Sequence, residues 1–234
     1  MEMKPITLCG VPALAWGKDS DRRILAVHGM MSHKADEPIR LLAEAAERQG
    51  IQTVSIDLPG HGDRKGEMAL CTAQHCVPEL HAMRESLLEE SREVGLFGVS
   101  LGACFRLMAA AGLPLCQALL VSPVVDMENL IQTMMIWAGV TEERLERERE
   151  IPTDFGQTLS WDYLKYVRQH PVHALSAHTN ILYGDQDNLV PQPVVECFAR
   201  AEGAHLTVYP GGEHWFHTPE QMKVMGTWEE RCLP

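Results

Sequence analysis

The residues with the clearest potential for chemistry are a serine set between two glycines, Gly98-Val99-Ser100-Leu101-Gly102. A short apolar run, residues 94–97, precedes this G-x-S-x-G pattern, and a helix-compatible run, residues 103–111, follows it. At a sharp turn from a strand into a helix, the serine backbone is strained and its hydroxyl stands clear of the sheet. The flanking glycines remove Cβ atoms that would collide in such a turn. This context predicts a nucleophile elbow with Ser100 as the nucleophile.

A serine nucleophile needs two further groups. Its hydroxyl reacts poorly at neutral pH unless a base takes the proton and a third group orients that base. His214 lies in a loop after the last predicted strand and is the candidate base. The acid is expected in the preceding strand-end loop, where Asp185 and Asp187 both occur. The order serine, acid, histidine is the order that a sheet of this kind imposes, and either aspartate satisfies it.

The elements that would position these residues alternate along the chain. The predicted strands are one or two edge strands within residues 6–16 and then residues 22–27, 52–56, 94–97, 117–121, 179–183 and 206–209. Helix-like segments separate most of them, which predicts βαβ units and a mostly parallel sheet. Sites in such sheets form at the carboxyl ends of the strands. His28, Asp57, Ser100 and Ser122 all follow a predicted strand directly.

Residues 124–177 interrupt the alternation. They contain a Met-rich apolar stretch, a charged run and a Trp- and Tyr-containing segment. At about 54 residues this stretch is much longer than the usual connection of ~10–15 residues. We expect two or three helices that lie over the strand ends as a small cap, inserted within a single domain of residues 1–234. Residues 134–137 form either an acyl-binding wall beneath this cap or ordinary core.

Composition excludes several classes of protein. The formal charge of −12, from 20 basic and 32 acidic residues, argues against a nucleic-acid or anionic membrane surface. Seven cysteines without a C-x-x-C pair favour a reducing compartment and no disulfide framework. The histidines show no metal-ligand spacing, so we expect neither a metal nor another cofactor. The N-terminus lacks signal-peptide features, and no apolar stretch reaches ~20 residues, so we expect a cytoplasmic location.

Five motifs taken together resemble the α/β-hydrolases of the serine esterase and lipase-like type. They stand in family order and are His28-Gly29-Met30, Asp57-Leu58-Pro59-Gly60-His61-Gly62, Gly98-Val99-Ser100-Leu101-Gly102, Gly184-Asp185-Gln186-Asp187-Asn188-Leu189-Val190-Pro191 and Gly212-Glu213-His214. The resemblance extends from about residue 22 to the end of the chain. It implies the α/β-hydrolase fold, in which helices flank a mostly parallel central sheet, with a small helical cap insertion.

The resemblance also implies roles for individual residues. Ser100 matches the family's nucleophile and His214 its base. The family's G-x-x-D-x-x-V-P pattern falls on Asp187 rather than Asp185, which then reads as a turn-forming residue. Asp126 is a remote third candidate, because some relatives place the acid after the preceding strand.

The resemblance further implies an oxyanion hole made of backbone N–H groups. One N–H belongs to Leu101, the residue after the nucleophile, and the other to Met30, the residue after His-Gly. Preorganised donors of this kind stabilise the oxyanion by about 3–4 kcal/mol each. His28 would stabilise the loop that carries Met30.

The expected activity is cleavage of a small-molecule carboxylic ester with a small or medium acyl or aryl group, through an acyl-enzyme intermediate. The stretch from His28 to Lys34 and the mid-chain insertion are similar to small acyl and cinnamoyl (feruloyl) esterases. An acyl thioesterase or a serine peptidase would use the same three residues. The alternative outside the enzymes is a protein that binds a ligand without catalysing a reaction. Each of these functions is compatible with a homo-oligomer.

Overall fold

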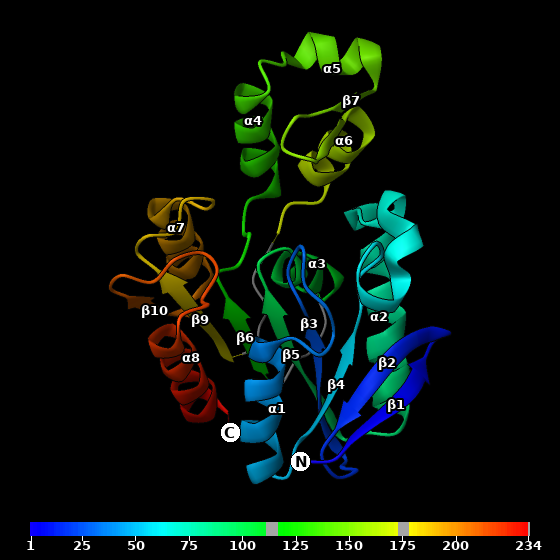
Figure 1. Cartoon of the computed structure of the whole chain (residues 1–234), viewed down its shortest axis with the longest axis vertical. Helices are drawn as coiled ribbons and strands as arrows, with labels where there is room; N and C mark the ends of the chain where they lie inside the picture. Colours follow the sequence, from blue (N-terminus) through cyan, green and yellow to red (C-terminus); the bar gives the residue numbers. More distant parts are fainter. Residues whose placement is uncertain (111–116, 173–177, 234) are drawn as a thin grey trace.

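The computed structural model describes residues 1–110, 117–172 and 178–233. Its centre is an eight-stranded sheet with the order β1-β2-β4-β3-β5-β6-β9-β10 (Figure 1). β2 is antiparallel to β1 and β4, and every other neighbouring pair is parallel. The strands are β1 (Met3–Leu8), β2 (Val11–Trp16), β3 (Arg22–Val27), β4 (Gln52–Ile56), β5 (Glu93–Val99), β6 (Gln117–Val121), β9 (His178–Gly184) and β10 (His205–Tyr209). The predicted mostly parallel sheet is confirmed.

Helices cover both faces of this sheet. α1 (Glu37–Arg48) and α8 (Pro219–Cys232) pack on one face, and α2 (Ala73–Glu89), α3 (Leu101–Ala109) and α7 (Gln192–Glu202) pack on the other. α1 shows why its sequence folds this way, since Ile39, Leu42, Ala43 and Ala46 recur at helical spacing and are all buried. The α/β-hydrolase arrangement expected from the motifs is therefore present.

Central strands are buried along most of their length because helices cover both faces of the sheet. β4 and β6 are buried at every residue, as are the last five residues of β3. Strands that are covered on both faces read as continuous apolar runs rather than as alternating patterns. This burial holds the carboxyl ends of the strands, and the loops that follow them, at one rigid edge.

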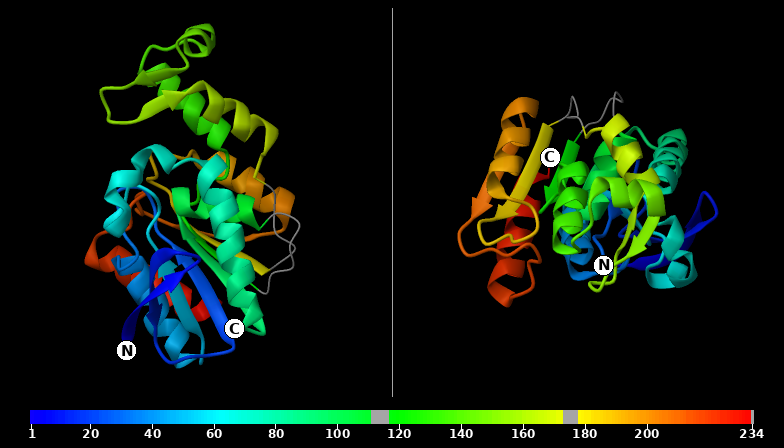
Figure 2. Two further views of the ribbon diagram at one scale, coloured as in Figure 1. Left: turned by 90° about the vertical axis from the view of Figure 1, so that its right-hand side faces the viewer. Right: turned by 90° about the horizontal axis from the view of Figure 1, so that it is seen from above.

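The chain between β6 and β9 forms a separate lobe beyond that edge (Figures 1 and 2). It contains α4 (Met127–Trp137), α5 (Glu142–Glu148), the hairpin of β7 (Glu150–Pro152) and β8 (Thr158–Ser160), and α6 (Trp161–Gln169). The hairpin was not predicted, because three-residue strands are too short to show a period. The C-terminal end of the predicted insertion, residues 173–177, lies outside the described residues, as does Cys116.

The apolar side chains of this lobe join the main core. Leu145, Leu164 and Met135 are buried in the same cluster as the sheet face covered by α2 and α3. Ile136 and Trp137, at the end of α4, are instead exposed. The stretch 134–137 is thus partly core and partly surface, rather than a single wall.

Candidate active site

Ser100 occupies a sharp turn between β5 and α3. Its backbone has φ 50° and ψ −114°, in the positive-φ region that residues other than glycine rarely adopt. The chain folds so tightly here that a Cβ on Gly98 would lie 2.5 Å from the Cα of Ala103. The strained serine and the glycine that permits the turn are the features expected of a nucleophile elbow.

Gly102 offers a direct test of how tightly this elbow packs. A Cβ at position 102 would lie 2.2 Å from the carbonyl oxygen of His28 and 2.6 Å from that of Val27. Because both are backbone atoms of a central strand, Gly102→Ala is expected to destabilise the protein by more than about 3 kcal/mol. Urea unfolding measures this difference.

The matched control for that substitution is Gly226→Ala, in the interior of α8. Its added Cβ would meet only the side chain of Leu41, at 3.5 Å or more. Alanine there is expected to leave stability unchanged or to raise it by about 0.5–1 kcal/mol. Equal stability of the two variants would contradict the tight packing at position 102.

Three side chains from separate loops form a hydrogen-bonded chain. The hydroxyl oxygen of Ser100 lies 2.8 Å from Nε2 of His214, and Nδ1 of His214 lies 2.6 Å from Oδ2 of Asp187. The other carboxylate oxygen of Asp187 accepts the backbone N–H groups of Leu189 and Val190 at 2.8 and 2.9 Å. An ionised carboxylate only accepts, so Nδ1 carries the proton and Nε2 is left to accept from the serine hydroxyl.

The other two candidate acids make different contacts. Asp185 accepts the backbone N–H of Gly211 at 2.7 Å, which ties together the loops after β9 and β10. Asp126 is the N-cap of α4 and accepts the N–H of Asn129 at 2.9 Å. Of the three carboxylates, Asp187 is the one that contacts His214.

The residues before and at the two positions predicted for an oxyanion hole, Gly29 and Leu101, lie next to Ser100. A Cβ on Gly29 would lie 3.2 Å from the Cβ of Ser100, so the loop that continues into Met30 lies directly against the serine. Leu101 is the first residue of α3, and the first N–H groups of a helix have no partner within that helix. The positive end of the helix dipole also points toward this position.

Two histidines hold these loops in place. The Nδ1–H of His28 donates to the carbonyl of Gly29, and its Nε2 accepts the N–H of Leu58 at 3.0 Å. Burial lowers the pKa of His28 to about 4, so the ring is neutral and can accept. His61 accepts the N–H of Met31 at 3.0 Å. His28 thus has the loop-stabilising position that the resemblance implied.

A buried charge cluster that the sequence did not reveal joins the loops after β3 and β4. Asp57 is fully buried and accepts from the backbone N–H of Lys34 at 2.7 Å, from the Lys34 ammonium, and from the N–H of Asp63 at 2.9 Å. Burial alone would raise the pKa of Asp57, but the hydrogen bonds from Lys34 and Asp63 hold it below its usual value. The position of Asp57 at a strand end was visible in the sequence, whereas its partner 23 residues away was not.

Asp57→Asn should therefore destabilise the protein in a pH-dependent way. Removing one partner of a buried ion pair costs about 3–5 kcal/mol, which is the loss expected at pH 7. Because the folded-state pKa of Asp57 is lowered, its contribution is complete above the unfolded pKa of ~4 and is lost as pH falls through the folded value. Urea unfolding at a series of pH values should show that the difference in free energy of unfolding between Asp57→Asn and wild type becomes smaller below about pH 4.

Asp63→Asn is the control for this prediction, since Asp63 also pairs with Lys34 but its side chain is 66% exposed. Asp63→Asn should lower the free energy of unfolding by less than about 1 kcal/mol. A loss as large as that of Asp57→Asn, or a gap for Asp57→Asn that persists at low pH, would contradict the assignment.

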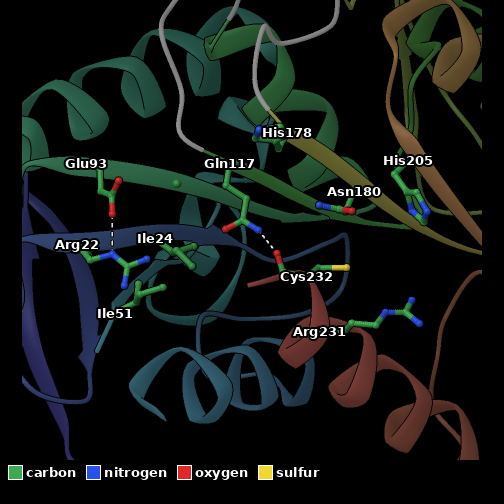
Figure 3. A pocket seen from close by; sticks show the side chains of 11 residues that line it. Arg22, Ile24, Ile51, Glu93, Gln117, His178, Asn180, His205, Arg231 and Cys232 are labelled. Atoms are coloured by element: carbon green, nitrogen blue, oxygen red, sulfur yellow. Dashed lines mark hydrogen bonds and ion pairs between the residues drawn. The ribbon is translucent and has the colours of Figure 1, made fainter. Parts of the chain in front are cut away.

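Two cavities lie away from Ser100. One of about 580 Å³ opens at the opposite, amino-terminal edge of the sheet, where Arg22 pairs with Glu93 at 2.6 Å and His178 and His205 begin their strands (Figure 3). The other, of about 540 Å³, lies among α4, α6 and α7. Neither lining includes a member of the Ser100–His214–Asp187 chain.

Over residues 1–110, 117–172 and 178–233, no group of three or more His, Cys, Asp or Glu side chains is arranged to hold a metal ion. Within the same residues, no helix is both long and apolar enough to span a membrane. The cysteines at positions 9, 71, 76, 104, 197 and 232 are free.

Comparison with known proteins identifies the family of this chain and solved structures that share its fold. A family model described as the alpha/beta hydrolase family matches residues 24–224. A candidate hydrolase from Agrobacterium vitis S4 has 18% identity and a TM-score of 0.80, over 100% of this chain and 99% of that one. Est1E from Butyrivibrio proteoclasticus, solved with ferulic acid bound, has 18% identity and a TM-score of 0.77, over 97% and 96%. The thioesterase domain from the curacin biosynthetic pathway has 16% identity and a TM-score of 0.63, over 100% and 97%.

At these identities the solved structures show a shared fold and no more. The comparison with curated proteins found no match.

Proposed function

The chain belongs to the alpha/beta hydrolase family, and on that basis we propose that it is a serine hydrolase that cleaves a carboxylic ester through an acyl-enzyme intermediate. The observation that carries the proposal is the hydrogen-bonded chain from Ser100 through His214 to Asp187, at 2.8 and 2.6 Å. It begins at a serine in the strained turn that is expected of a nucleophile elbow.

In the proposed first half-reaction, the oxygen of Ser100 attacks the ester carbonyl carbon while Nε2 of His214 takes the hydroxyl proton. Asp187 stabilises the imidazolium through the proton on Nδ1. The N–H groups of Met30 and Leu101 hold the oxyanion of the tetrahedral intermediate. The intermediate collapses when the C–O bond to the alcohol breaks, and His214 gives its proton to that alcohol.

In the second half-reaction, water replaces the alcohol. His214 takes a proton from the water as its oxygen attacks the acyl carbon, and the same N–H groups hold the second oxyanion. Collapse breaks the bond to Ser100, and the proton on Nε2 returns to the serine oxygen. The acid leaves and the starting state is restored.

Exposed apolar side chains beside this centre support a substrate with an acyl or aryl group. Met31 and Trp215, the neighbours of Met30 and His214 in sequence, are 92% and 71% exposed. Exposed apolar residues that gather at one place mark binding sites more often than chance surface. We propose small or medium acyl or aryl esters, a class to which the ferulic acid bound in Est1E also points.

The lobe between β6 and β9 is proposed to act as a cap over the site, within a single domain of residues 1–234. Its position beyond the carboxyl edge of the sheet supports this role, as does its shared core with the sheet (Figure 2). The free cysteines support the proposed reducing, cytoplasmic setting.

A substrate panel tests the proposal. Hydrolysis of p-nitrophenyl esters of rising acyl length, methyl ferulate, an acyl-CoA thioester and a peptide amide should be compared by kcat/KM. We expect an ester to be the best substrate. A thioester preferred by more than about tenfold would favour the thioesterase alternative. No turnover of any member, with no covalent labelling by a fluorophosphonate, would favour a binding protein.

A further inference from the structure

Cys71 and Cys76 form a second group of reactive side chains, outside the Ser100 site. Thr72 is the N-cap of α2, so Cys71 is the residue before the cap and Cys76 is the fourth helical residue. Side chains at these two positions pack against each other at the start of a helix. Cys76 is fully buried, and Cys71 packs on the same core while remaining partly exposed. The Cys76 thiol donates to the carbonyl of Leu70, the residue before Cys71, at 3.6 Å, so it lies against the backbone that carries Cys71.

The environment of Cys71 favours its thiolate. The neighbouring Cys76 thiol lowers the pKa of Cys71 well below its usual value, against the opposing effect of partial burial, and His61 and Arg64 act in the same direction. The adjacent N-terminus of α2 also favours negative charge. The Cys71 sulfur and burial raise the pKa of Cys76, so Cys76 stays protonated and donates to the carbonyl of Leu70. In contrast, burial raises the pKa of Cys104 to about 12.

Cys71 also connects to the proposed oxyanion loop. His61, whose pKa the nearby Cys71 sulfur raises, accepts the backbone N–H of Met31 at 3.0 Å. Met31 follows Met30, whose own N–H is one of the two proposed oxyanion donors. A change in the oxidation state of the Cys71 sulfur would therefore act on the loop of Met30 and Met31 through the imidazole of His61.

The same two cysteines lie where the lobe meets the main body. α6 packs against α2, and the side-chain amide of Gln74 donates to the carbonyl of Asp162 at 3.1 Å. Tyr163 of α6 is partly buried near Cys71 and Cys76. A covalent change at the cysteines would thus act at the base of the proposed cap.

We propose that Cys71 and Cys76 are a site of reversible oxidation, in which hydrogen peroxide converts the pair into an intramolecular disulfide. The Cys71 thiolate attacks one peroxide oxygen, so that an S–O bond forms, the O–O bond breaks and hydroxide leaves. The Cys76 sulfur then attacks the sulfenic acid, an S–S bond forms, and the S–O bond breaks with release of water. The two sulfurs lose two electrons to the peroxide, and a dithiol reductant returns them.

Mass spectrometry of the full chain after peroxide treatment tests this site. We expect the chain to lose the mass of two hydrogen atoms, and the loss to fall in the peptide that contains both Cys71 and Cys76. Dithiothreitol should reverse it. Cys76→Ser should instead leave a sulfenic acid at Cys71 that dimedone traps. Cys197→Ser, which removes an exposed cysteine elsewhere, should form the disulfide at the wild-type rate.

A second measurement keeps the test decisive if Cys76→Ser does not fold. In the unaltered protein at neutral pH, iodoacetamide should alkylate Cys71 at least about tenfold faster than Cys197. Slower alkylation of Cys71 than of Cys197 would overturn the proposal, and so would a disulfide that does not include Cys71 and Cys76. These readouts do not depend on ester hydrolysis, so they stand or fall separately from the proposed function.

Discussion

Ser100→Ala is expected to lower kcat for ester hydrolysis by about 10⁵-fold or more and to abolish covalent labelling by a fluorophosphonate. The loss is this large because alanine removes the atom that forms the acyl-enzyme bond, and His214 and the oxyanion donors cannot replace it. Residual rate above that of water would come from the oxyanion donors alone. Active-site labelling and p-nitrophenyl ester turnover measure the two effects.

The control for this prediction is another strand-end serine. Ser122 directly follows β6, as Ser100 follows β5, and it also has positive φ. Its side chain is completely buried and its hydroxyl has no hydrogen-bond partner. Ser122→Ala should keep labelling and turnover within a few-fold of wild type. Labelling of the Ser100→Ala protein at the wild-type rate would remove Ser100 from the mechanism.

Asp187→Asn is expected to lower kcat by about 10⁴-fold while leaving the fold intact. The loop determines how an asparagine would sit, because one oxygen of Asp187 accepts the N–H groups of Leu189 and Val190. The amide oxygen of asparagine would keep those two bonds, so its NH₂ group would face Nδ1 of His214. An amide donor there moves the histidine proton to Nε2, where it can no longer accept from Ser100.

Asp185→Asn is the matched control, two residues away in the same loop. Its amide oxygen can still accept the N–H of Gly211, so activity should change by less than about threefold. Steady-state kinetics with one ester, together with unfolding curves for both variants, separate the two residues. A larger loss of kcat in Asp185→Asn than in Asp187→Asn would show that the acid has been assigned to the wrong carboxylate.

Buried strands were the part of the fold that the sequence predicted best. β3, β4 and β6 have the predicted bounds, because an apolar run enclosed by turn residues has little freedom to shift. The last helix begins where its local sequence favours a start, with Thr218 as its N-cap and Pro219 as its first residue. The hairpin β7–β8 was missed, because its few residues carry no pattern that distinguishes a strand from a loop.

Contacts between distant loops could not be predicted from local sequence patterns. The sequence identified Asp57 and His28 at strand ends, but the Lys34 ammonium on Asp57 and the N–H of Leu58 on His28 depend on how two loops meet. The proposed pairing of Cys71 with Cys76 depends on the N-cap of α2, and the sequence alone does not give the start of that helix to the exact residue.

The sequence by itself determined the type of fold and the identity of the candidate nucleophile and base. G-x-S-x-G and the strand-end loops are local features, and each is encoded within a few neighbouring residues. Tertiary structure decided which carboxylate contacts His214, because Asp185 and Asp187 differ only in the direction that a short loop gives their side chains. It also decided that Gly29 lies against Ser100, since that contact joins the ends of β3 and β5, which are neighbours in the sheet but far apart in the sequence.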